Sequence, residues 1–393
     1  MNVDRARVLH APSRARPGRV ACCARTRAAA GLTCLGAAAA SGLFGCMRPG
    51  EERARQDEQV GHATSAAFDV DVVDGLAVVR GLDAASLELW ANAPRLELSL
   101  SFHAPPPETL WLEVDNCMPG AALEGAGLLV SESGREGKRC FFRVGPFDPA
   151  AEDEPVRLGL APPETAITSP FRFGVMSDIQ EALPRVHEIY QVVNLEPGLD
   201  FMLSAGDLTE HGTRAQLARF QAELEALDIP YYTTLGNHEL RESPCRFQDY
   251  FGRGSSSFEY RGARLTLLDS ASATIDPIVM AWLDDWLERG ADRVHVVAMH
   301  VPPRDPIGLR EVAFASRNEA SQLLARLAGG GVDLTLYGHI HSYYRFENAG
   351  IRAYISGGGG SHPERFDGIG RHFLVVDVDP LAASTSVRVV RVD

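Results

Sequence analysis

Short runs in which apolar and polar residues alternate fill the stretch between Ala66 and about Pro162. Clusters of Pro, Gly and Asp separate these runs, of which clear examples are Leu96–Leu100, Leu110–Val114 and Cys140–Val144. Alternation at every second residue is typical of a strand with one buried face, and the close spacing of the runs favours antiparallel pairing. The pattern predicts a β-sandwich domain over residues 66–162. This stretch contains no catalytic constellation.

A proline-rich segment at residues 161–170, which we interpret as a hinge, separates this stretch from a different pattern. Beyond it, apolar runs rich in β-branched and aromatic residues lie at 171–176, 201–204, 231–235, 265–268, 294–299, 334–337, 354–356 and 373–378. Between several of them, apolar residues recur with the spacing of one helix face. Alternating strands and helices predict a second domain of the α/β class, α+β in type, over residues 171–393.

The N-terminal segment differs from both domains. Residues 1–27 are basic, and residues 28–46 are uncharged, rich in Ala, Gly and Leu, and end in Leu-Phe-Gly-Cys. A basic region followed by an apolar one predicts export. The last four residues resemble the lipobox of bacterial lipoproteins, which implies a signal peptide over residues 1–45, cleavage before Cys46, and a lipid on Cys46 that anchors the protein to the periplasmic or cell-surface side of a bacterial membrane.

Two alternatives for this segment remain open, an ordinary cleaved signal peptide and an uncleaved anchor helix. The apolar stretch is marginal in length for a membrane span, which needs about 20 predominantly apolar residues. Residues 46–65 are polar and lack an apolar period. This composition predicts a flexible tether between the anchor and the sandwich.

Charge limits the classes of partner. The chain has 52 acidic and 38 basic residues in 393, which gives a net charge of −14. This composition excludes collagen-like, low-complexity and wholly disordered proteins. It also argues against general nucleic-acid binding, because a phosphate backbone attracts basic surfaces. A small anionic substrate would need a local positive centre.

Three cysteines lie beyond Cys46. In an oxidising compartment Cys117 and Cys140, both in the predicted sandwich, are the natural disulfide pair, and Cys245 would stay free. The alternative is three buried thiols. No spacing among these cysteines is that of a zinc-finger pair.

Short segments that contain Asp, Asn, Gln or His follow five of the apolar runs of the second domain. In chain order they are Ser177-Asp178-Ile179-Gln180, Ala205-Gly206-Asp207, Gly236-Asn237-His238-Glu239, Met299-His300 and Gly338-His339-Ile340-His341. Ligands of open α/β sheets bind beyond the carboxyl ends of the strands, so we expect the five groups to converge on one crevice. Any one of these residues alone is more often a turn, a cap or an ordinary histidine.

The residue types of these groups favour metal binding. Asp, Asn and His supply oxygen and nitrogen ligands for divalent transition ions, and one carboxylate can bridge two ions. Two ions about 3.5 to 4 Å apart polarise a phosphoryl oxygen and generate hydroxide at neutral pH. They would also supply the positive charge that an acidic protein lacks.

The order of these motifs resembles that of the calcineurin-like metallophosphoesterase superfamily, D-x-H, G-D, G-N-H-[DE], a lone His and G-H-x-H, over roughly residues 171–380. The resemblance implies two packed mixed β-sheets flanked by helices and a dinuclear site for Mn, Fe, Zn or Mg. It implies that Asp178, Gln180 and His341 hold one ion, that Asn237, His300 and His339 hold the other, and that Asp207 bridges them. His238 would face the substrate and either stabilise phosphoryl charge or protonate the leaving oxygen.

Two residues depart from family patterns. Gln180 stands where most members have histidine, and its neutral amide oxygen predicts a looser first ion and a preference for manganese, magnesium or iron(II) over zinc. Glu210 occupies the place of the tyrosine of purple acid phosphatases, so no purple colour is expected. The Gln180 change also leaves open a degenerate, weakly active site.

Three residues in loops near the motifs are candidate phosphate contacts, Arg241, Arg304 and His362, although a solvated surface role is equally compatible with the arginines. The glycine run at 357–360 lacks the Gly-Lys-Ser/Thr of a phosphate-binding loop and is interpreted as a flexible strand exit.

The sequence shows no side-chain nucleophile paired with a general base. The sequence thus predicts a metal-dependent phosphoesterase in which activated water attacks a phosphate mono- or diester. The alternative is a membrane-anchored binding or interaction lipoprotein with a degenerate phosphoesterase site.

Overall fold

The structure is a computed structural model that describes residues 49–103, 105–147, 154–163, 165–308, 312–364 and 368–393. The described residues from 49 to 393 belong to one compact unit. The predicted signal segment 1–45 and the predicted lipidation site Cys46 lie outside the described residues. Among the helices that the structure describes, none is both long enough and apolar enough to cross a bilayer.

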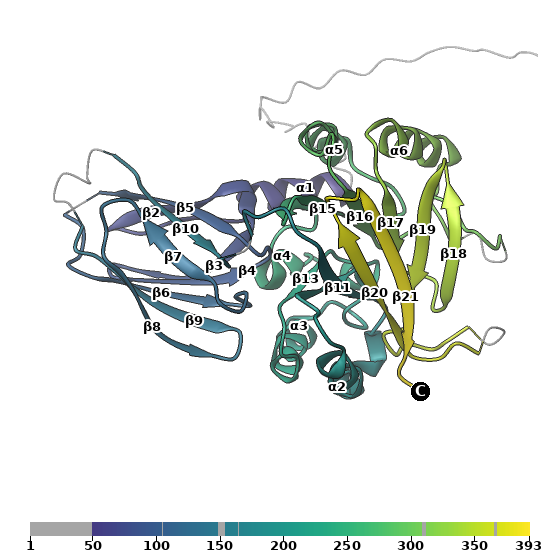
Figure 1. Ribbon diagram of the computed structural model, residues 1–393, viewed down its shortest axis with the longest axis horizontal. Coiled ribbons are helices and arrows are strands. Elements are labelled where there is room, and N and C mark those ends of the chain that lie inside the picture. The colour runs from purple at the N-terminus through teal and green to yellow at the C-terminus, as the bar shows by residue number, and fades with distance from the viewer. Residues whose placement is uncertain (1–48, 104, 148–153, 164, 309–311, 365–367) are drawn as a thin grey trace, which may run out of the picture. The chain divides into compact units, whose positions relative to one another are not determined.

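Residues 62–161 form the two sheets of a β-sandwich (Figure 1). One sheet has the order β1 (His62–Thr64), β2 (Phe68–Val72), β5 (Leu96–Phe102), β10 (Val156–Ala161) and β7 (Ala122–Gly125). The other has the order β3 (Ala77–Asp83), β4 (Ser86–Ala91), β6 (Leu110–Asp115), β9 (Arg139–Val144) and β8 (Val130–Glu136). The alternation seen in the sequence places one side of each strand in the core: Leu96, Leu98 and Leu100 are buried, whereas Glu97 between them is exposed.

Cys117 and Cys140 form a disulfide in this sandwich, as predicted, with 6.3 Å between their Cα atoms. Cys245 is a free thiol and is partly buried. Burial raises the pKa of the Cys245 thiol to about 11, which keeps it in the unreactive protonated form.

Residues 171–393 form two mixed sheets that pack face to face. The first has the order β13 (Tyr231–Thr233), β12 (Phe201–Ser204), β11 (Phe171–Met176), β20 (His372–Asp379) and β21 (Ser384–Arg391). The second has the order β14 (Ser256–Tyr260), β15 (Ala263–Leu268), β16 (His295–Met299), β17 (Leu334–Tyr337), β19 (Ile351–Ser356) and β18 (Tyr343–Asn348). The pairs β11–β12, β12–β13, β15–β16, β16–β17 and β17–β19 are parallel, so their carboxyl ends point the same way within each sheet.

Helices cover the outer face of each sheet, which gives four layers (Figure 1). α2 (His187–Leu195), α3 (Arg214–Glu223) and α4 (Phe247–Phe251) pack on the first sheet, and α5 (Pro277–Arg289) and α6 (Arg317–Gly329) pack on the second. Between the sheets lies an aromatic core in which Phe201 contacts Phe173, Tyr232 and Tyr260. The predicted fold, two packed mixed sheets with flanking helices preceded by a β-sandwich, is confirmed.

The predicted tether is wrong, because residues 49–59 form a helix, α1 (Pro49–Gln59), that packs on the second domain. Arg53 and Asp57 are 5% and 1% exposed. Arg53 Nε donates to Asp269 Oδ2 at 2.6 Å, and Asp57 accepts from the backbone N–H groups of Gly254 and Ser255 at 3.0 and 2.9 Å. The sequence of this segment suggested a solvated chain because its charged side chains bind partners about 200 residues away, which no local pattern reveals.

The sandwich contacts the second domain through polar residues on its strand ends. The Asn116 side chain donates to the carbonyl of Tyr231 at 2.9 Å and accepts from the Tyr231 N–H at 2.9 Å. Lys138, the single lysine of the chain, donates to the carbonyls of Leu224 and Leu227. The Asn116 contacts hold the start of strand β13, whose carboxyl end leads to one of the candidate site loops.

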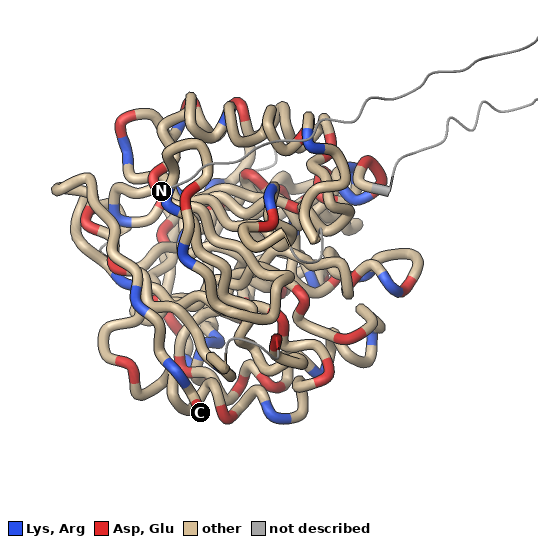
Figure 2. Tube along the Cα trace, turned by 90° about the vertical axis from the view of Figure 1, so that its right-hand side faces the viewer, with Lys and Arg blue, Asp and Glu red and all other residues tan. Residues whose placement is uncertain are grey.

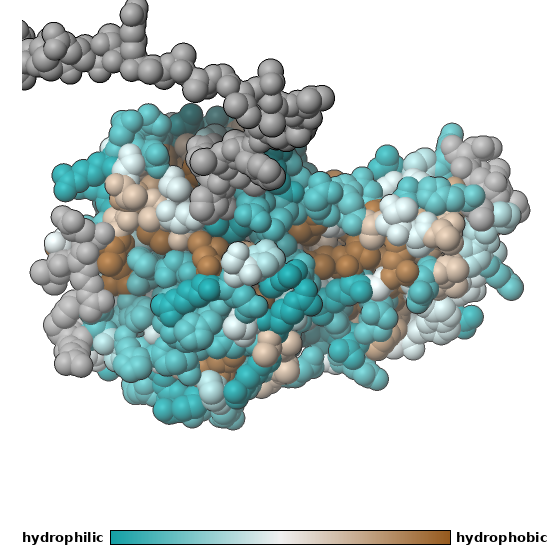
Figure 3. Space-filling model, turned by 180° about the vertical axis from the view of Figure 1, so that it is seen from behind, coloured by the Kyte–Doolittle hydropathy of each residue, from teal (hydrophilic) through white to brown (hydrophobic). Residues whose placement is uncertain are grey.

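Charge and apolar side chains are distributed unevenly over the fold. In Figure 2, acidic and basic residues are scattered over loops and helices, whereas the strands in the middle of the view carry few charges. Figure 3 shows a largely hydrophilic face interrupted by patches of apolar residues. The strongly acidic composition therefore resides mainly in the outer layers, and the buried charges described next stand out against an apolar core.

Candidate metal centre

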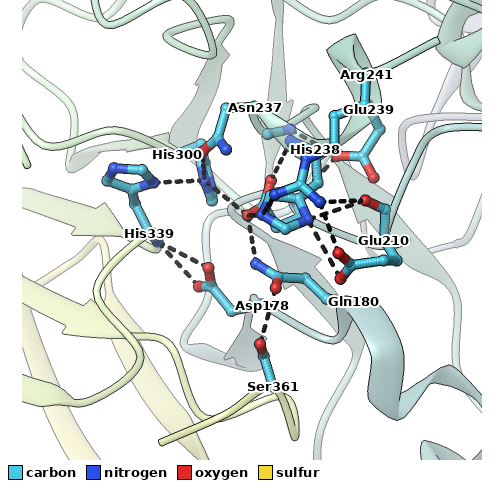
Figure 4. A network of polar contacts seen from close by, with 12 residues as sticks. Asp178, Gln180, Glu210, Asn237, His238, Glu239, Arg241, His300, His339 and Ser361 are labelled. Carbon is cyan, nitrogen blue, oxygen red and sulfur yellow. Dashed lines mark hydrogen bonds and ion pairs between the residues drawn. The ribbon is translucent and has the colours of Figure 1, made fainter. Parts of the chain in front are cut away.

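The five predicted groups meet at one end of the two central sheets (Figure 4). Asp178 and Gln180 follow β11, Asp207 follows β12, and Asn237 follows β13 by a short loop. His300 comes directly after β16, and His339 and His341 follow β17. The expectation that residues from separate strand ends converge is therefore confirmed by their contacts.

Ligand atoms of Asp207, His300 and His339 all lie within 4.8 Å of one another. His300 Nε2 is 3.3 Å from Asp207 Oδ2, 3.2 Å from His339 Nδ1 and 3.0 Å from Asn237 Oδ1. Lone pairs from two imidazoles, an amide and a carboxylate thus face a common point. A divalent cation is the natural partner for such a convergence of acceptors.

Two of the imidazoles are oriented by carbonyl oxygens. His300 Nδ1 lies 2.8 Å from the carbonyl of Ala205, and His341 Nδ1 lies 2.8 Å from the carbonyl of His362. A proton on each Nδ1 leaves Nε2 as the atom that faces the centre. This is the arrangement by which ligating histidines are usually fixed.

The opposite side of the centre contains Asp178, Gln180 and His341. His341 Nε2 is 3.5 Å from Asp178 Oδ1 and 3.2 Å from Gln180 Nε2. Gln180 presents its nitrogen to the centre, since Nε2 donates to Asp207 Oδ2 at 2.7 Å, and its oxygen accepts from Ser361. The structure therefore brings Gln180 to the predicted place with the amide nitrogen, and not the oxygen, facing inward.

Backbone strain is concentrated in these loops. Asp178, Gln180, Asp207 and His339 have φ values of 63°, 49°, 54° and 69°, in the left-handed region that is uncommon for such residues. Gly236 allows the close approach of two loops, because a Cβ on it would lie 2.0 Å from Asp207 Oδ1. Strained backbone of this kind persists where the surroundings enforce it and is frequent at functional sites.

Glu239 links two of the loops and was not assigned this role from the sequence. Its carboxylate accepts from the N–H groups of Gly236, Asp207 and Thr209 at 2.8, 3.1 and 3.0 Å. Burial, together with the negative charge of Asp207, raises the pKa of Glu239 to about 7. The fourth residue of the Gly-Asn-His-Glu motif therefore positions Asp207 and Asn237 from beneath.

The ionisable groups of the centre influence each other strongly. Burial opposes charge on His300 and His341, but Asp207 beside the first and Asp178 beside the second outweigh it and raise both pKa values to about 9. Burial alone would raise the pKa of Asp207, yet its histidine neighbours lower it. The carboxylates thus create a negative potential, and protons on the two histidines now balance it as a cation would.

The predicted metal ligands therefore fit two divalent ions unequally. Asp207, Asn237, His300 and His339 offer one set of oxygen and nitrogen donors that already face one another. Asp178, Asp207 and His341 offer a second set that lacks a fourth donor while the Gln180 nitrogen faces inward. Both sets consist of the ligand types that first-row divalent ions accept.

His238 and Arg241 lie beside the centre and contact Glu210. His238 Nε2 is 3.8 Å from Asp207 Oδ2 and 2.8 Å from Arg241 Nη2, and Arg241 Nη1 donates to Glu210 Oε1 at 2.6 Å. A guanidinium can only donate, so His238 Nε2 accepts in this arrangement and the proton is on Nδ1, facing the Glu210 carbonyl 3.1 Å away. The structure therefore places His238 and Arg241 together at the edge of the centre.

The two remaining substrate candidates lie further out. The His362 side chain is 90% exposed and is paired with Glu181, so its ring does not face the centre. Its backbone carbonyl instead contacts Nδ1 of His341, one of the residues of the centre. Arg304 is exposed and lines a cavity of about 950 Å³ with Phe314 and Leu324. The glycine run 357–360, expected to be a flexible exit, is buried at Gly357 to Gly359 and packs against Ser177 and His341.

Comparisons with known proteins agree with this geometry. Residues 171–343 match the family model described as calcineurin-like phosphoesterase. A probable glycerophosphodiester phosphodiesterase of Arcobacter nitrofigilis is 28% identical over 177 residues, which are 42% of this chain and 64% of that protein. A 3',5'-cyclic-nucleotide phosphodiesterase of Nostoc sp. is 27% identical over 161 residues, which are 38% of this chain and 59% of that protein.

The chain thus spans less than two thirds of the length of these curated relatives. Among solved structures, a purple acid phosphatase from yellow lupin seeds aligns with a TM-score of 0.48 and 13% identity, over 76% of this chain and 70% of that one. With the family match and the convergent Asp and His residues, the segment from residue 171 to residue 343 is a calcineurin-like metallophosphoesterase domain.

Proposed function

We propose that the protein is a metal-dependent phosphoesterase that hydrolyses small phosphate esters at a dinuclear centre. The observation that carries the proposal is the convergence of Asp207, His300 and His339, from three separate strand ends, to within 4.8 Å. Such a cluster of buried acceptors is unfavourable without a cation, since buried charges need partners. When bound, two divalent ions would polarise the phosphoryl group and activate a water molecule for in-line attack.

The assigned roles follow the contacts of each side chain. Asp178, Gln180 and His341 would hold one ion, Asn237, His300 and His339 the other, and Asp207 would bridge them. His300 and His341 are held with Nε2 toward the centre by carbonyl oxygens, which removes the need to reorient them during catalysis. Glu239 holds the backbone of the Asp207 and Asn237 loops in place.

His238 and Arg241 would face the substrate. Arg241 donates to His238 and to Glu210, and a phosphate at the centre would offer the guanidinium a stronger bidentate acceptor than an imidazole nitrogen. Transfer of Arg241 to the phosphate would free His238 Nε2 to approach the leaving oxygen. Arg304 and His362 lie further out, so they would contact only parts of a substrate that extend well beyond the centre.

We propose a phosphate diester as the favoured substrate class, with monoesters as the alternative. The support is that the two curated relatives named above are described as phosphodiesterases. The acidic groups Glu181 and Glu210 at the edge of the centre favour the same choice, because a diester carries one negative charge and a monoester about two.

The test is hydrolysis of para-nitrophenyl phosphate and of its bis-ester by protein stripped with EDTA and reloaded with manganese. We expect turnover of the bis-ester that requires manganese and that is lost in Asp207→Asn, while Asp228→Asn, a change in an exposed acid, retains it. A chiral phosphorothioate diester should react with inversion at phosphorus. Net retention would reject direct attack by water.

One observation favours a second function, a binding lipoprotein with a degenerate site. Gln180 directs a nitrogen at the centre, which weakens one of the two metal subsites. If neither ester is hydrolysed with manganese, zinc, iron(II) or magnesium while metal still binds, this second function replaces the first.

We also propose that Cys46 carries a lipid and that the protein is exported to a bacterial membrane surface. The support is the sequence of residues 1–46 alone. Because α1 begins at Pro49, two residues would separate a lipidated Cys46 from a helix that is docked on the catalytic domain. Mass analysis of the mature N-terminus, with Cys46→Ala as control, tests the modification, and an unmodified Cys46 would contradict it.

A further inference from the structure

The Gln180 side chain is held partly by Ser361, a residue that lies outside the metal-binding motifs. Its Nε2 points to Asp207 and His341, and its Oε1 accepts from the hydroxyl of Ser361 at 2.8 Å (Figure 4). An amide nitrogen has no lone pair to offer a cation, whereas the amide oxygen has two. Gln180 can therefore complete the subsite of Asp178 and His341 only after its amide has turned over.

The Ser361 hydroxyl has a second acceptor within reach. The carboxylate oxygens of Glu181 lie 3.4 and 3.2 Å from Ser361 Oγ, and Ser361 is 5% exposed, so water does not compete freely. A hydroxyl carries one proton and can also accept hydrogen bonds. With its proton on Gln180 Oε1 it holds the amide nitrogen inward; with its proton on Glu181 it can accept from Nε2, and the amide oxygen then faces the centre.

Glu181 is itself fixed independently of this exchange. The backbone N–H of His362 donates to Glu181 Oε1 at 3.0 Å, and the exposed ring of His362 pairs with the same oxygen. The backbone contact remains whatever the ring does. The carboxylate is thus a permanent acceptor beside Ser361, which can take the hydroxyl proton when the amide of Gln180 turns over.

We propose that Glu181 and Ser361 form a relay that selects which atom of Gln180 faces the metal centre, and that this relay makes the Asp178 and His341 subsite the second to fill. The inference rests on the function proposed above and adds an order of metal binding to it. The Asp207, Asn237, His300 and His339 subsite needs no rotation, because its donor atoms already face one another. The first ion binds there, and the second binds more weakly.

A double-mutant cycle distinguishes an effect of the relay on metal affinity from the effect of simply removing a negative charge. Calorimetric titration of manganese into EDTA-stripped protein is carried out for the unaltered chain, Glu181→Ala, Gln180→His and the double variant. We expect Glu181→Ala to weaken the second ion by about 10- to 100-fold, the usual range for residues that orient metal ligands, and to leave the first nearly unchanged. In the Gln180→His background the same change should have a much smaller effect, because no amide remains to be turned.

Two controls keep the test decisive. If Gln180→His fails to fold, Ser361→Ala provides the background in which Glu181→Ala should have little effect. Ser256→Ala removes a buried hydroxyl without a hydrogen-bond partner among the described residues, and should leave both affinities unchanged.

The outcomes distinguish this inference from the function on which it rests. A loss of second-ion affinity that is equal in the Gln180 and Gln180→His backgrounds would show a charge effect alone and overturn the relay. Two ions of equal affinity in the unaltered protein would also overturn it, and would leave the phosphoesterase proposal standing. A chain that binds no manganese at all would contradict both.

Discussion

The sandwich and the catalytic domain are both built from packed pairs of sheets, but they differ in what they bury. Within the described part of residues 66–162, the buried polar side chains are Asn92 and Asn116. The strand ends of the catalytic domain bury Asp178, Asp207 and His300 almost completely, at 0%, 1% and 0% exposure. The first domain follows the usual rule for a core, whereas the second also buries ionisable side chains, among them this group at its strand ends.

The difference teaches where function lies in this chain. An unpaired buried charge is expensive, so selection for stability alone would replace it with an apolar residue. The sandwich shows what such a core looks like, with Leu96, Leu98 and Leu100 in the interior. We attribute the buried charged cluster of the other domain to the chemistry proposed for it, and variants in the two domains test this division.

The largest effect should separate chemistry from stability. His300→Ala removes a ligand of the better formed subsite and should lower ester hydrolysis by about 1,000-fold or more, the equivalent of several kcal/mol of transition-state stabilisation. Leu98→Ala in the sandwich should lower the free energy of unfolding by about 2 to 5 kcal/mol and leave kcat unchanged. Steady-state kinetics and urea unfolding measure the two. A large fall in kcat for Leu98→Ala would break the comparison.

The next effect concerns α1, which joins the catalytic domain through buried charge. Arg53→Ala leaves Asp269 buried without its partner and should lower the free energy of unfolding by about 3 to 5 kcal/mol. Arg55 lies on the same helix in an exposed pair with Glu51, so Arg55→Ala should cost less than about 1 kcal/mol. Chemical denaturation measures both values. An equal loss of unfolding free energy in the two variants would indicate that this segment is a solvated tether after all.

A smaller and graded effect is the pH dependence of metal binding. Without metal, His300 and His341 have pKa values of about 9, so both carry protons at pH 7. These protons must leave before Nε2 can bind a cation. Manganese affinity should therefore rise with pH up to about 9, by about tenfold per pH unit for each proton released. Calorimetry in buffers of different ionisation enthalpy counts the protons, and a flat profile from pH 6 to 9 would contradict the assignment.

The smallest effect should be that of the exposed aromatic residue on the sandwich. Trp111 is 49% exposed and lies under the guanidinium of Arg143. Trp111→Ala should change stability by less than about 0.5 to 1 kcal/mol, as expected for an exposed cation–π contact, and should not alter kcat or KM. A clear change in KM would give the sandwich a share in substrate binding.

The central strands could be predicted from the sequence because their apolar runs are continuous. The runs at 171–176, 201–204 and 334–337 coincide with β11, β12 and β17. The strands β14, β18 and β21 were missed, because polar residues such as Glu259, Glu347 and Arg388 interrupt their apolar runs. In this domain the prediction relied on continuous apolar runs, which these three strands lack.

The metal-binding residues could be predicted for a related reason, since each lies at a fixed place just after a strand. The residues that orient them could not. Ser361 contacts Gln180 and its neighbour Glu181 across 181 and 180 positions, and Arg53 contacts Asp269 across 216. Such partners are determined by the packing of distant segments, and a polar residue alone in the sequence gives no sign of it.

The most direct test of the account is the position of the metal itself. Crystals soaked in manganese should give an anomalous difference peak within about 2.0 to 2.3 Å of Asp207, His300 and His339, which are normal ligand distances for a first-row ion. A second, weaker peak should lie on the side of Asp178 and His341. Manganese bound elsewhere, or no peak among these three side chains, would contradict the claim that the strand ends build a metal centre.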